Sequence, residues 1–368
     1  MTDEKFISIN GKSLKSPIVL SSMAGISNAD YVIKRARYAG MAIIGGYNID
    51  DAASTASKII QEGGRKEFDD SFENIAVQIQ RIKDADSSIA VGLNLRGTTP
   101  DAFLEAAEYF GHDIIYEIDS HCRQKPMIDA KSGEYFLKNP EKLCEIVSTL
   151  SDSGYYVSVK TRAGIADDAK LAKMLWKAGA DIIHVDLMDH GYTKLRQIRN
   201  SCPLVIIGNN GVKNPDKMMD YFSHGADLVS LARGADPDTI MALYRFINSA
   251  AENVGWYNAP KQLCRGGDLR SLAFCCMPIK QCPLLPTLSK IDMSKEHYLE
   301  LKTKAVEGNE LSHGAHTCFG SLAFCCKSST PCMFREMTLK TLNIENSRYM
   351  KLKRDLSEAI MSDIFGTE

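Results

Sequence analysis

Short apolar runs alternate with stretches of helical apolar spacing along the first two thirds of the chain. The runs are continuous rather than alternating, which is typical of strands buried on both faces of a parallel sheet. Eight such strands are predicted, at Pro17–Ser22, Met41–Gly45, Ile89–Leu95, Ile114–Ile118, Tyr156–Lys160, Ile182–Val185, Leu204–Gly208 and Leu228–Leu231. Eight β/α units of this kind predict an α/β fold, a (β/α)8 TIM barrel.

The segments between these strands carry helix signals. Helices are predicted over Pro140–Ser153, with Asn139 positioned to cap it, over Asp167–Ala178 and over Asn214–His224. A doubly wound sheet is the alternative fold. Its nucleotide fingerprint would be a glycine-rich turn after the first strand, and the sequence SSMAGISN at that place lacks it.

The pattern changes after Asn253, where strand–helix alternation stops and cysteine, glycine and proline cluster. One helix is predicted in the polar spacer, over Lys295–Val306, and another at the end, over Ser347–Ile364. We therefore expect three parts: a TIM barrel over residues 1–250, a small cysteine-rich metal-binding domain over 251–345 and a C-terminal helix over 346–368.

The cysteine-rich part contains an internal repeat. Both copies include SLAFCC, and eight of the chain's 11 cysteines fall in them. Thiolates are soft ligands, and four on a compact loop can hold iron–sulfur or zinc. The predicted metal ligands are Cys264, Cys275, Cys276 and Cys282 in the first copy, and Cys318, Cys325, Cys326 and Cys332 in the second.

Composition and charge narrow the class of protein. The formal net charge is −2, which argues against a large nucleic-acid footprint. No apolar run is long enough to span a bilayer, and the polar N-terminus MTDEKFISING does not resemble a secretory signal. We expect a cytoplasmic protein without a membrane partner, in which reduced thiols favour metal ligation over disulfides.

In a TIM barrel, binding residues lie at the C-terminal ends of the strands. The candidates at these ends, in chain order, are Ser22, Met23, Ala24, Asn94, Cys122, Lys160, His184, Asn209, Gly211, Arg233 and Gly234. The last four belong to the loops GNNG and RGA after the seventh and eighth strands, where such barrels bind a phosphate. These loops predict a cofactor with one phosphate rather than a dinucleotide.

These segments resemble the tRNA dihydrouridine synthases and, more distantly, other FMN barrels such as dihydroorotate dehydrogenases. The resemblance runs from about Pro17 to Ala235 and is carried by PIVLSSMAGISN, LNLRGTTP, YEIDSHCRQK, VKTRAG, IIHVD, IIGNNGV and LARGA. It implies bound FMN, a catalytic cysteine at Cys122, and flavin contacts from Lys160 and His184. Asn94 stands where that family usually has a flavin-binding glutamine.

Three of these residues also have simpler interpretations. Lys160 could be a solvated strand-end lysine, but a cation at this point would stabilise a reduced flavin, and we favour that role. His184 could be a satisfied core histidine, although its place one strand after Lys160 favours flavin contact. For Cys122, a general acid and a small buried hydrophobe are both open.

The chain departs from the family pattern around the cysteine and at its C-terminus. The usual Asn-x-Gly-Cys-Pro is replaced by Asp119, Ser120, His121, Cys122 and Arg123. The basic helical domain with which the family grips tRNA is replaced by the cysteine-rich module. We therefore expect a substrate other than tRNA, and we also expect the Asp119 carboxylate to disfavour an anionic substrate near the flavin.

The tail CRGGDLRSLAFCCMP…CPL resembles the cysteine-rich domain of the archaeal methanogenesis marker 9 family, which is often found behind a dihydrouridine-synthase-like barrel. The resemblance implies an anaerobic archaeal cytosol, where oxygen-sensitive clusters persist. An iron–sulfur cluster, 4Fe-4S in the simplest case, is the first interpretation because it could exchange electrons with a flavin. Structural zinc is the second, and redox-active thiols are the third.

The leading hypothesis is an FMN-dependent oxidoreductase with a C-terminal iron–sulfur module, linked to methanogen metabolism or cofactor assembly. Its partner would be a small-molecule substrate or a protein electron carrier. The alternatives are a divergent tRNA-dihydrouridine synthase, for which tRNA would be the partner, and a non-catalytic iron–sulfur scaffold or metallochaperone.

Overall fold

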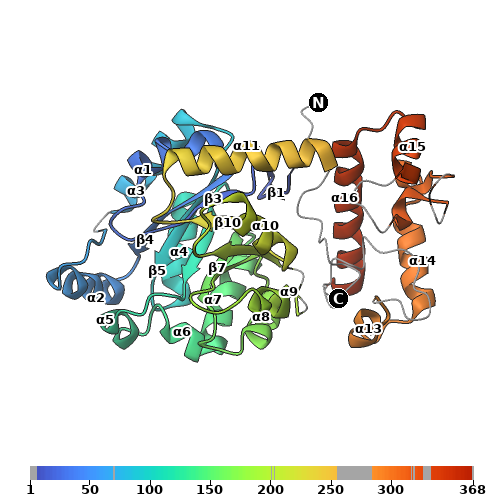
Figure 1. Cartoon of the computed structure of the whole chain (residues 1–368). Helices are drawn as coiled ribbons and strands as arrows, with labels where there is room; N and C mark the ends of the chain where they lie inside the picture. The colour runs from blue at the N-terminus through green and yellow to red at the C-terminus, as the bar shows by residue number, and fades with distance from the viewer. Residues whose placement is uncertain are drawn as a thin grey trace. The chain divides into compact units, whose positions relative to one another are not determined.

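A computed structural model describes residues 6–366 apart from 69–70, 200, 203, 255–283, 316, 318–319 and 326–332. The chain divides into two compact units. The larger consists of Ile7–Tyr221 and Ala226–Tyr244, and the smaller of Met1–Phe6, Phe222–Gly225 and Arg245–Glu368. The larger unit is an α/β barrel with its helices outside the strands, and the described part of the smaller is helical (Figure 1).

The barrel is a closed ring of parallel strands in the order β10-β3-β4-β5-β6-β7-β8-β9. Each strand after β3 pairs with the next one along the chain, and β10 closes the ring onto β3. The strands are β3 Ile18–Leu20, β4 Met41–Asn48, β5 Ala90–Arg96, β6 Ile115–Asp119, β7 Tyr156–Arg162, β8 Ile182–Asp186, β9 Val205–Asn209 and β10 Leu228–Leu231. All eight strands predicted from the sequence are confirmed, and so is the TIM barrel.

Helices follow the strands around the ring. They are α1 Ala29–Ile33, α2 Asp51–Glu62, α3 Phe72–Ala85, α4 Pro100–Phe110, α5 Lys125–Asp129, α6 Tyr135–Lys138, α7 Pro140–Asp152, α8 Asp168–Lys177, α9 Thr193–Arg199, α10 Pro215–Ser223 and α11 Pro237–Val254. The three barrel helices predicted from the sequence are confirmed as α7, α8 and α10, with ends that differ by one residue. Short polar side chains cap several of them: the Asp50 carboxylate accepts the N–H of Ala53 at the start of α2.

The predicted capping role of Asn139 is wrong. Its side chain makes no cap hydrogen bond to α7. Instead, Nδ2 donates to the carbonyl of Tyr135 at 2.9 Å, because Asn139 also ends the preceding helix α6. A carbonyl that has lost its helical partner competes for the side chain that would otherwise cap the next helix.

A short antiparallel hairpin, β1 Ser8–Ile9 and β2 Lys12–Ser13, was not predicted. Ile9 and Leu14 are buried with Val19, Met41 and other inward residues near the strand starts. The hairpin region therefore contributes to an apolar core at the N-terminal end of the barrel. Access to the barrel interior is left to the opposite end, where the strands finish.

The smaller unit contains α13 Leu284–Lys290, α14 Lys295–Ala305, η3 Glu310–Ser312, η4 Leu322–Phe324, α15 Met333–Thr341 and α16 Asn346–Phe365. The predicted helices at Lys295–Val306 and Ser347–Ile364 are confirmed as α14 and α16, which contact each other. α13 and α15 were not predicted. Within the described parts of the chain, no helix is both long and apolar enough to span a membrane.

Seven of the eight predicted metal-binding cysteines lie outside the described residues: Cys264, Cys275, Cys276, Cys282, Cys318, Cys326 and Cys332. Cys325 is described, and it lies half-buried directly after η4. The carbonyls of Ala323 and Cys325 lie within 2.8 and 3.5 Å of the buried amine of Lys353. Among the described residues, no three His, Cys, Asp or Glu side chains gather as a metal site.

Candidate active site

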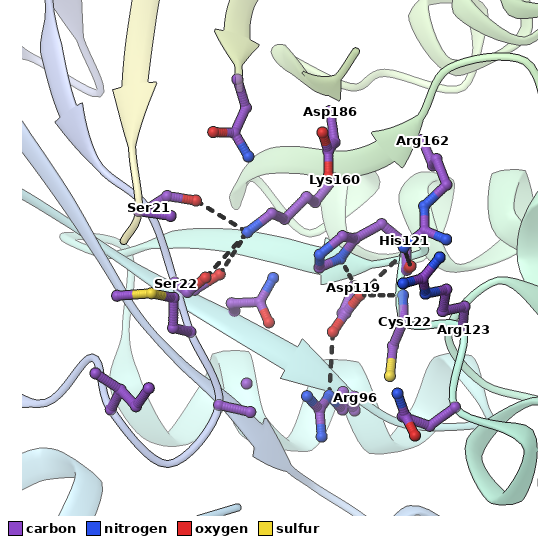
Figure 2. Close-up of a pocket in the computed structure, with 18 of the residues that line it drawn as sticks. Ser21, Ser22, Arg96, Asp119, His121, Cys122, Arg123, Lys160, Arg162 and Asp186 are labelled. Atoms are coloured by element: carbon purple, nitrogen blue, oxygen red, sulfur yellow. Dashed lines mark hydrogen bonds and ion pairs between the residues drawn. The ribbon is translucent and has the colours of Figure 1, made fainter. Parts of the chain in front are cut away.

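A cavity of about 310 Å³ opens at the C-terminal ends of the strands (Figure 2). Most of the predicted site residues line it: Ser22, Met23, Ala24, Asn94, Cys122, Lys160, Asn209 and Arg233. The position follows from the barrel, because parallel strands bring residues from distant parts of the chain to one mouth. Eight of the eleven predicted residues are thus brought together by the fold.

A second hollow, of about 450 Å³, adjoins the first and shares Asp186, Met188, Asn209, Ala232 and Arg233 with it. Gly211 and Gly234 line this second hollow. A Cβ at Gly234 would meet nothing within 4 Å, and at Gly211 it would meet only the Lys217 side chain at 4.0 Å. The two backbones therefore face open space, as a phosphate cradle requires.

Lys160 spans the floor between β7 and the segment after β3. Its Nζ donates to Ser21 Oγ at 3.0 Å, to Ser22 Oγ at 2.8 Å and to the Ser22 carbonyl at 3.3 Å. The side chain is 1% exposed but still borders the cavity. A buried, hydrogen-bonded amine is thus held in one position at the base of the site, and Figure 2 shows it between the two serines and Asp119.

His184 does not line either hollow. It is fully buried, with Nδ1 at 2.7 Å from Glu117 Oε2 and Nε2 at 2.8 Å from Ser230 Oγ. Burial lowers the pKa of His184, so the ring is neutral and donates through Nδ1. Burial alone would raise the pKa of Glu117, but His184, Lys160 and an Asn94 hydrogen bond at 2.9 Å lower it. The histidine therefore belongs to a polar layer beneath the cavity.

Asp119, at the end of β6, organises the other side of the cavity. Its Oδ1 accepts the backbone N–H groups of His121 and Cys122, both at 3.1 Å, and lies 2.8 Å from His121 Nδ1. Its Oδ2 is 3.1 Å from Arg96 Nε, and Arg96 also contacts Glu67 at 2.5 Å. Burial alone would raise the pKa of Asp119, but His121 and Arg96 hold it well below its usual range.

The expectation that Asp119 disfavours an anionic substrate rested on an unpaired carboxylate, whereas the structure pairs it. The carboxylate is 1% exposed and forms an ion pair with Arg96, which also pairs with Glu67. A carboxylate paired with a cation at contact distance projects less field into the cavity than an unpaired one. The sequence alone could not reveal this pairing, because Arg96 lies on a different strand.

Cys122 lies between the cavity and a small apolar cluster. Its side chain is 8% exposed and packs with Ala53, Ile60 and Met127 from α2 and α5. Gly133, at φ +62°, lets the chain pass close behind it, since a Cβ there would lie 2.5 Å from the Cys122 carbonyl. Burial raises the pKa of Cys122, with the charge of Asp119 adding to the effect, so the thiol is protonated at neutral pH.

Six charged residues of the cavity were not among the eleven predicted site residues: Arg65, Arg96, Asp119, Arg123, Arg162 and Asp186. Three of them are two positions after a predicted residue on the same strand. Because strand side chains alternate between faces, Arg96 shares a face with Asn94, Arg162 with Lys160, and Asp186 with His184. The two-residue period of a strand could therefore have identified Arg96, Arg162 and Asp186. Arg65 comes from the loop after α2, and no sequence signal marks it.

The two hollows fit FMN. The first is bordered by an amide and a buried amine, at Asn94 and Lys160, which suit the polar edge of a flavin ring. The second offers the backbone of Gly211 and Gly234 and the exposed guanidinium of Arg233, which suit a single phosphate.

Comparison with known proteins also points to a flavin-binding barrel. Residues 69–248 match the family described as Dihydrouridine synthase (Dus). The chain is 47% identical over 108 residues to the uncharacterized protein MJ0115 of Methanocaldococcus jannaschii, covering 29% of this chain and 70% of that protein. It is 29% identical over 231 residues to the uncharacterized protein MJ0144 of the same organism, covering 60% of this chain and 89% of that one.

Among solved structures, the chain resembles DHODH from Eimeria tenella, determined in complex with ferulenol. The TM-score is 0.53 and the identity 11%, over 70% of this chain and 86% of that chain. At this identity the likeness concerns the barrel fold alone. The segment that matches the Dus family contains Asn94, Cys122 and Lys160 of the cavity, whereas Ser22, Met23 and Ala24 precede that segment. Residues 69–248, about half of the chain, thus match the dihydrouridine synthase (Dus) family, and the barrel has the fold of the flavin-dependent oxidoreductases of that type.

Proposed function

We propose that the protein is an FMN-dependent oxidoreductase that acts on a small-molecule substrate, with Cys122 as its proton donor. One observation carries the proposal. Two adjoining hollows lie side by side: the first is lined by the protonated, nearly buried thiol of Cys122 and by Lys160, and the second by the phosphate cradle at Gly211 and Gly234. A flavin mononucleotide has the parts that two such hollows would hold.

Bound FMN would supply the hydride chemistry, and the chain would supply orientation and protons. Lys160 would place a positive charge against the ring edge, where the reduced flavin carries negative charge. Cys122 would hold a proton on Sγ at neutral pH, because its pKa is raised. Asp119 would position that thiol through the backbone N–H of Cys122.

FMN retention tests this proposal. Purified protein is mixed with excess FMN, FAD or NADPH and desalted, and the cofactor retained per chain is measured by absorbance. We expect FMN alone to be retained, near one per chain. Lys160→Ala should retain less, while Lys173→Ala, an exposed lysine on α8, should match the wild type. A wild-type protein that stays colourless would contradict the proposal and favour a non-catalytic scaffold.

A divergent tRNA-dihydrouridine synthase is the second candidate, and the family match over residues 69–248 favours it. The near-balanced formal charge of the chain, −2, argues against it, because tRNA binding depends on neutralising phosphates. The test is to incubate dithionite-reduced, FMN-loaded protein with unmodified tRNA transcripts and to measure dihydrouridine by mass spectrometry. Formation of dihydrouridine at a defined position, lost in Cys122→Ala, would establish this candidate instead.

We also propose that the cysteine repeat binds an iron–sulfur cluster that exchanges electrons with the flavin or with a protein carrier. The support is the repeat in the sequence: each copy has four cysteines, and in both copies an adjacent pair is followed by five residues and a further cysteine. Iron, sulfide and zinc analysis of anaerobically purified protein tests it. Iron with sulfide, lost when Cys275 and Cys276 or Cys325 and Cys326 are changed to serine, supports the cluster. Stoichiometric zinc without iron would contradict it.

A further inference from the structure

The cavity beside Cys122 is strongly cationic. Of the described residues that line it, two are carboxylates, Asp119 and Asp186. Six are cations: Arg65, Arg96, Arg123, Lys160, Arg162 and Arg233. An excess of this size in one small hollow raises the local concentration of anions and favours their binding.

Three of these cations already have a role. Arg96 is compensated by Glu67 and Asp119, which contact it at 2.5 and 3.1 Å. Lys160 is held by the serines after β3 and lies where the flavin ring is proposed to bind. Arg233 borders both hollows and faces the proposed phosphate site. The other three cations, Arg65, Arg123 and Arg162, have no role in the proposed flavin site.

Arg162 is held in place by two contacts, but one of its N–H groups has no acceptor among the described residues. One nitrogen donates to the His121 carbonyl at 2.9 Å, and another lies 3.3 Å from Glu134 Oε2. Its third nitrogen, Nε, is buried and has no hydrogen-bond acceptor among the described residues. Because a buried N–H without an acceptor costs free energy, this donor is suited to a ligand oxygen.

Arg123 adds a second guanidinium on the same side. It directly follows Cys122, is exposed, and forms no ion pair with any residue in the described ranges. Figure 2 shows Arg123 and Arg162 grouped with Cys122 and His121, across the cavity from Ser21 and Ser22. Arg65, from the loop after α2, also lines the cavity without an ion pair in the described part of the chain.

We propose that Arg123 and Arg162, assisted by Arg65, form an anion subsite that holds a carboxylate or phosphate group of the substrate beside Cys122. The inference rests on the proposed function, since it names the substrate class of that same site. Guanidinium groups match the planar oxygen pairs of carboxylates and phosphates and form charge-assisted hydrogen bonds with them. The positions of the arginines favour a small anion over a polymer, because all three line a hollow of about 310 Å³.

Calorimetry on FMN-loaded protein tests the subsite. With FMN bound, the phosphate cradle is filled, so added anions report on the other end of the cavity. The probes are succinate, inorganic phosphate and uncharged succinamide. We expect succinate, phosphate or both to bind and succinamide not to bind. Preference for one anion tells carboxylate from phosphate.

Variants then locate the binding. Arg123→Gln should weaken anion binding at least tenfold while retaining FMN. Lys125→Gln is the matched control, because this lysine is two residues away and is paired with Asp129 at 2.6 Å outside the cavity. It should change the affinity less than twofold. Absence of binding to the wild type, or equal effects of the two variants, would overturn the subsite.

Two further outcomes separate the proposals. If the protein does not retain FMN, the proposed function fails, and the titration is repeated on flavin-free Arg233→Gln protein, whose phosphate cradle is weakened. Anion binding there that is lost on adding Arg123→Gln still supports the subsite, and no binding overturns it. Binding of a tRNA transcript without binding of either small anion would also overturn it.

Discussion

Asp119 Oδ1 accepts the backbone N–H of Cys122 at 3.1 Å, so one buried carboxylate both positions this thiol and acts on its charge. Burial raises the pKa of Cys122 first, and the negative charge of Asp119 raises it further. Arg96 opposes this effect, but its charge is shared between Asp119 and Glu67. The arrangement keeps the proton on sulfur, as a proton donor requires.

Replacing Asp119 with asparagine should therefore make Cys122 more acidic. The substitution removes a negative charge near the thiolate and leaves Arg96 less compensated, and both changes lower the thiol pKa. We expect the pKa of the Cys122 thiol to fall, so that the thiolate forms at lower pH than in the wild type. Iodoacetamide alkylation over a pH series, followed by mass spectrometry of the Cys122 peptide, measures it.

The control for that experiment is Asp129→Asn, which removes an exposed carboxylate on α5. It should leave the alkylation profile of Cys122 unchanged. If Asp119→Asn and Asp129→Asn give the same profile as the wild type, the electrostatic role assigned to Asp119 is wrong.

Filling the space at Gly234 should separate phosphate binding from ring binding. A Cβ there meets nothing within 4 Å, so Gly234→Val is tolerated by the fold but occupies the phosphate cradle. We expect FMN to bind at least tenfold more weakly, since the charge-assisted phosphate contacts are lost. Riboflavin, which lacks the phosphate, should bind as it does to the wild type. Fluorescence titration measures both, and an equal loss for the two ligands would place the phosphate elsewhere.

Asp181 gives a prediction for pH-dependent stability. Burial raises its pKa to about 6 from the usual 3.8, although the N–H of Val157 donates to Oδ2 at 2.8 Å. The folded state holds this proton more tightly than the unfolded state, so the contribution is full below about pH 4 and is lost as pH rises through about 6. At neutral pH the ionised carboxylate destabilises the barrel.

Asp181→Asn removes that ionisation and keeps an oxygen for the N–H of Val157. We expect the free energy of unfolding to rise by about 1–2 kcal/mol at neutral pH, less than the full shift would give because the side chain is partly solvated. Urea unfolding measures it, and the gain should disappear near pH 4. A gain of equal size at both pH values would point to a cause other than ionisation.

The pair Arg199 and Asp227 should contribute strongly to stability. Both side chains are buried, they form an ion pair, and Asp227 also accepts the N–H of Ile206 on β9 at 2.9 Å. Arg199→Leu leaves the carboxylate without this cation and should cost about 3–5 kcal/mol of unfolding free energy. The double variant with Asp227→Asn should recover part of the loss. Urea unfolding that shows no recovery would mean that the pair does not act as a unit.

The barrel could be predicted from the sequence because its strands are continuous apolar runs separated by capped helices. Met41–Asn48 and Leu228–Leu231 are clear examples, since every residue of the second is buried. The hairpin at Ser8–Ile9 and Lys12–Ser13 could not be predicted, because two-residue strands are too short to show a period. Helices of four or five residues, such as α5 and α6, could not be predicted for the same reason.

The site was predictable where it depends on strand ends, and not where it depends on pairing between strands. Cys122, Lys160 and Asn94 meet in one cavity because each ends or follows a strand of the same ring. The ion pair of Asp119 is with Arg96, 23 residues away in sequence, and no local pattern shows that the two touch. His184 stands at the expected position, but its partners on other strands place it beneath the cavity floor.

The most direct test of the account is a crystal structure of the protein loaded with FMN. We predict that the phosphate lies against Gly211, Gly234 and Arg233, the ring edge lies against Lys160, and the thiol of Cys122 faces the open side of the ring. A flavin bound in the reverse direction, or outside these two hollows, would contradict the assignment of the site.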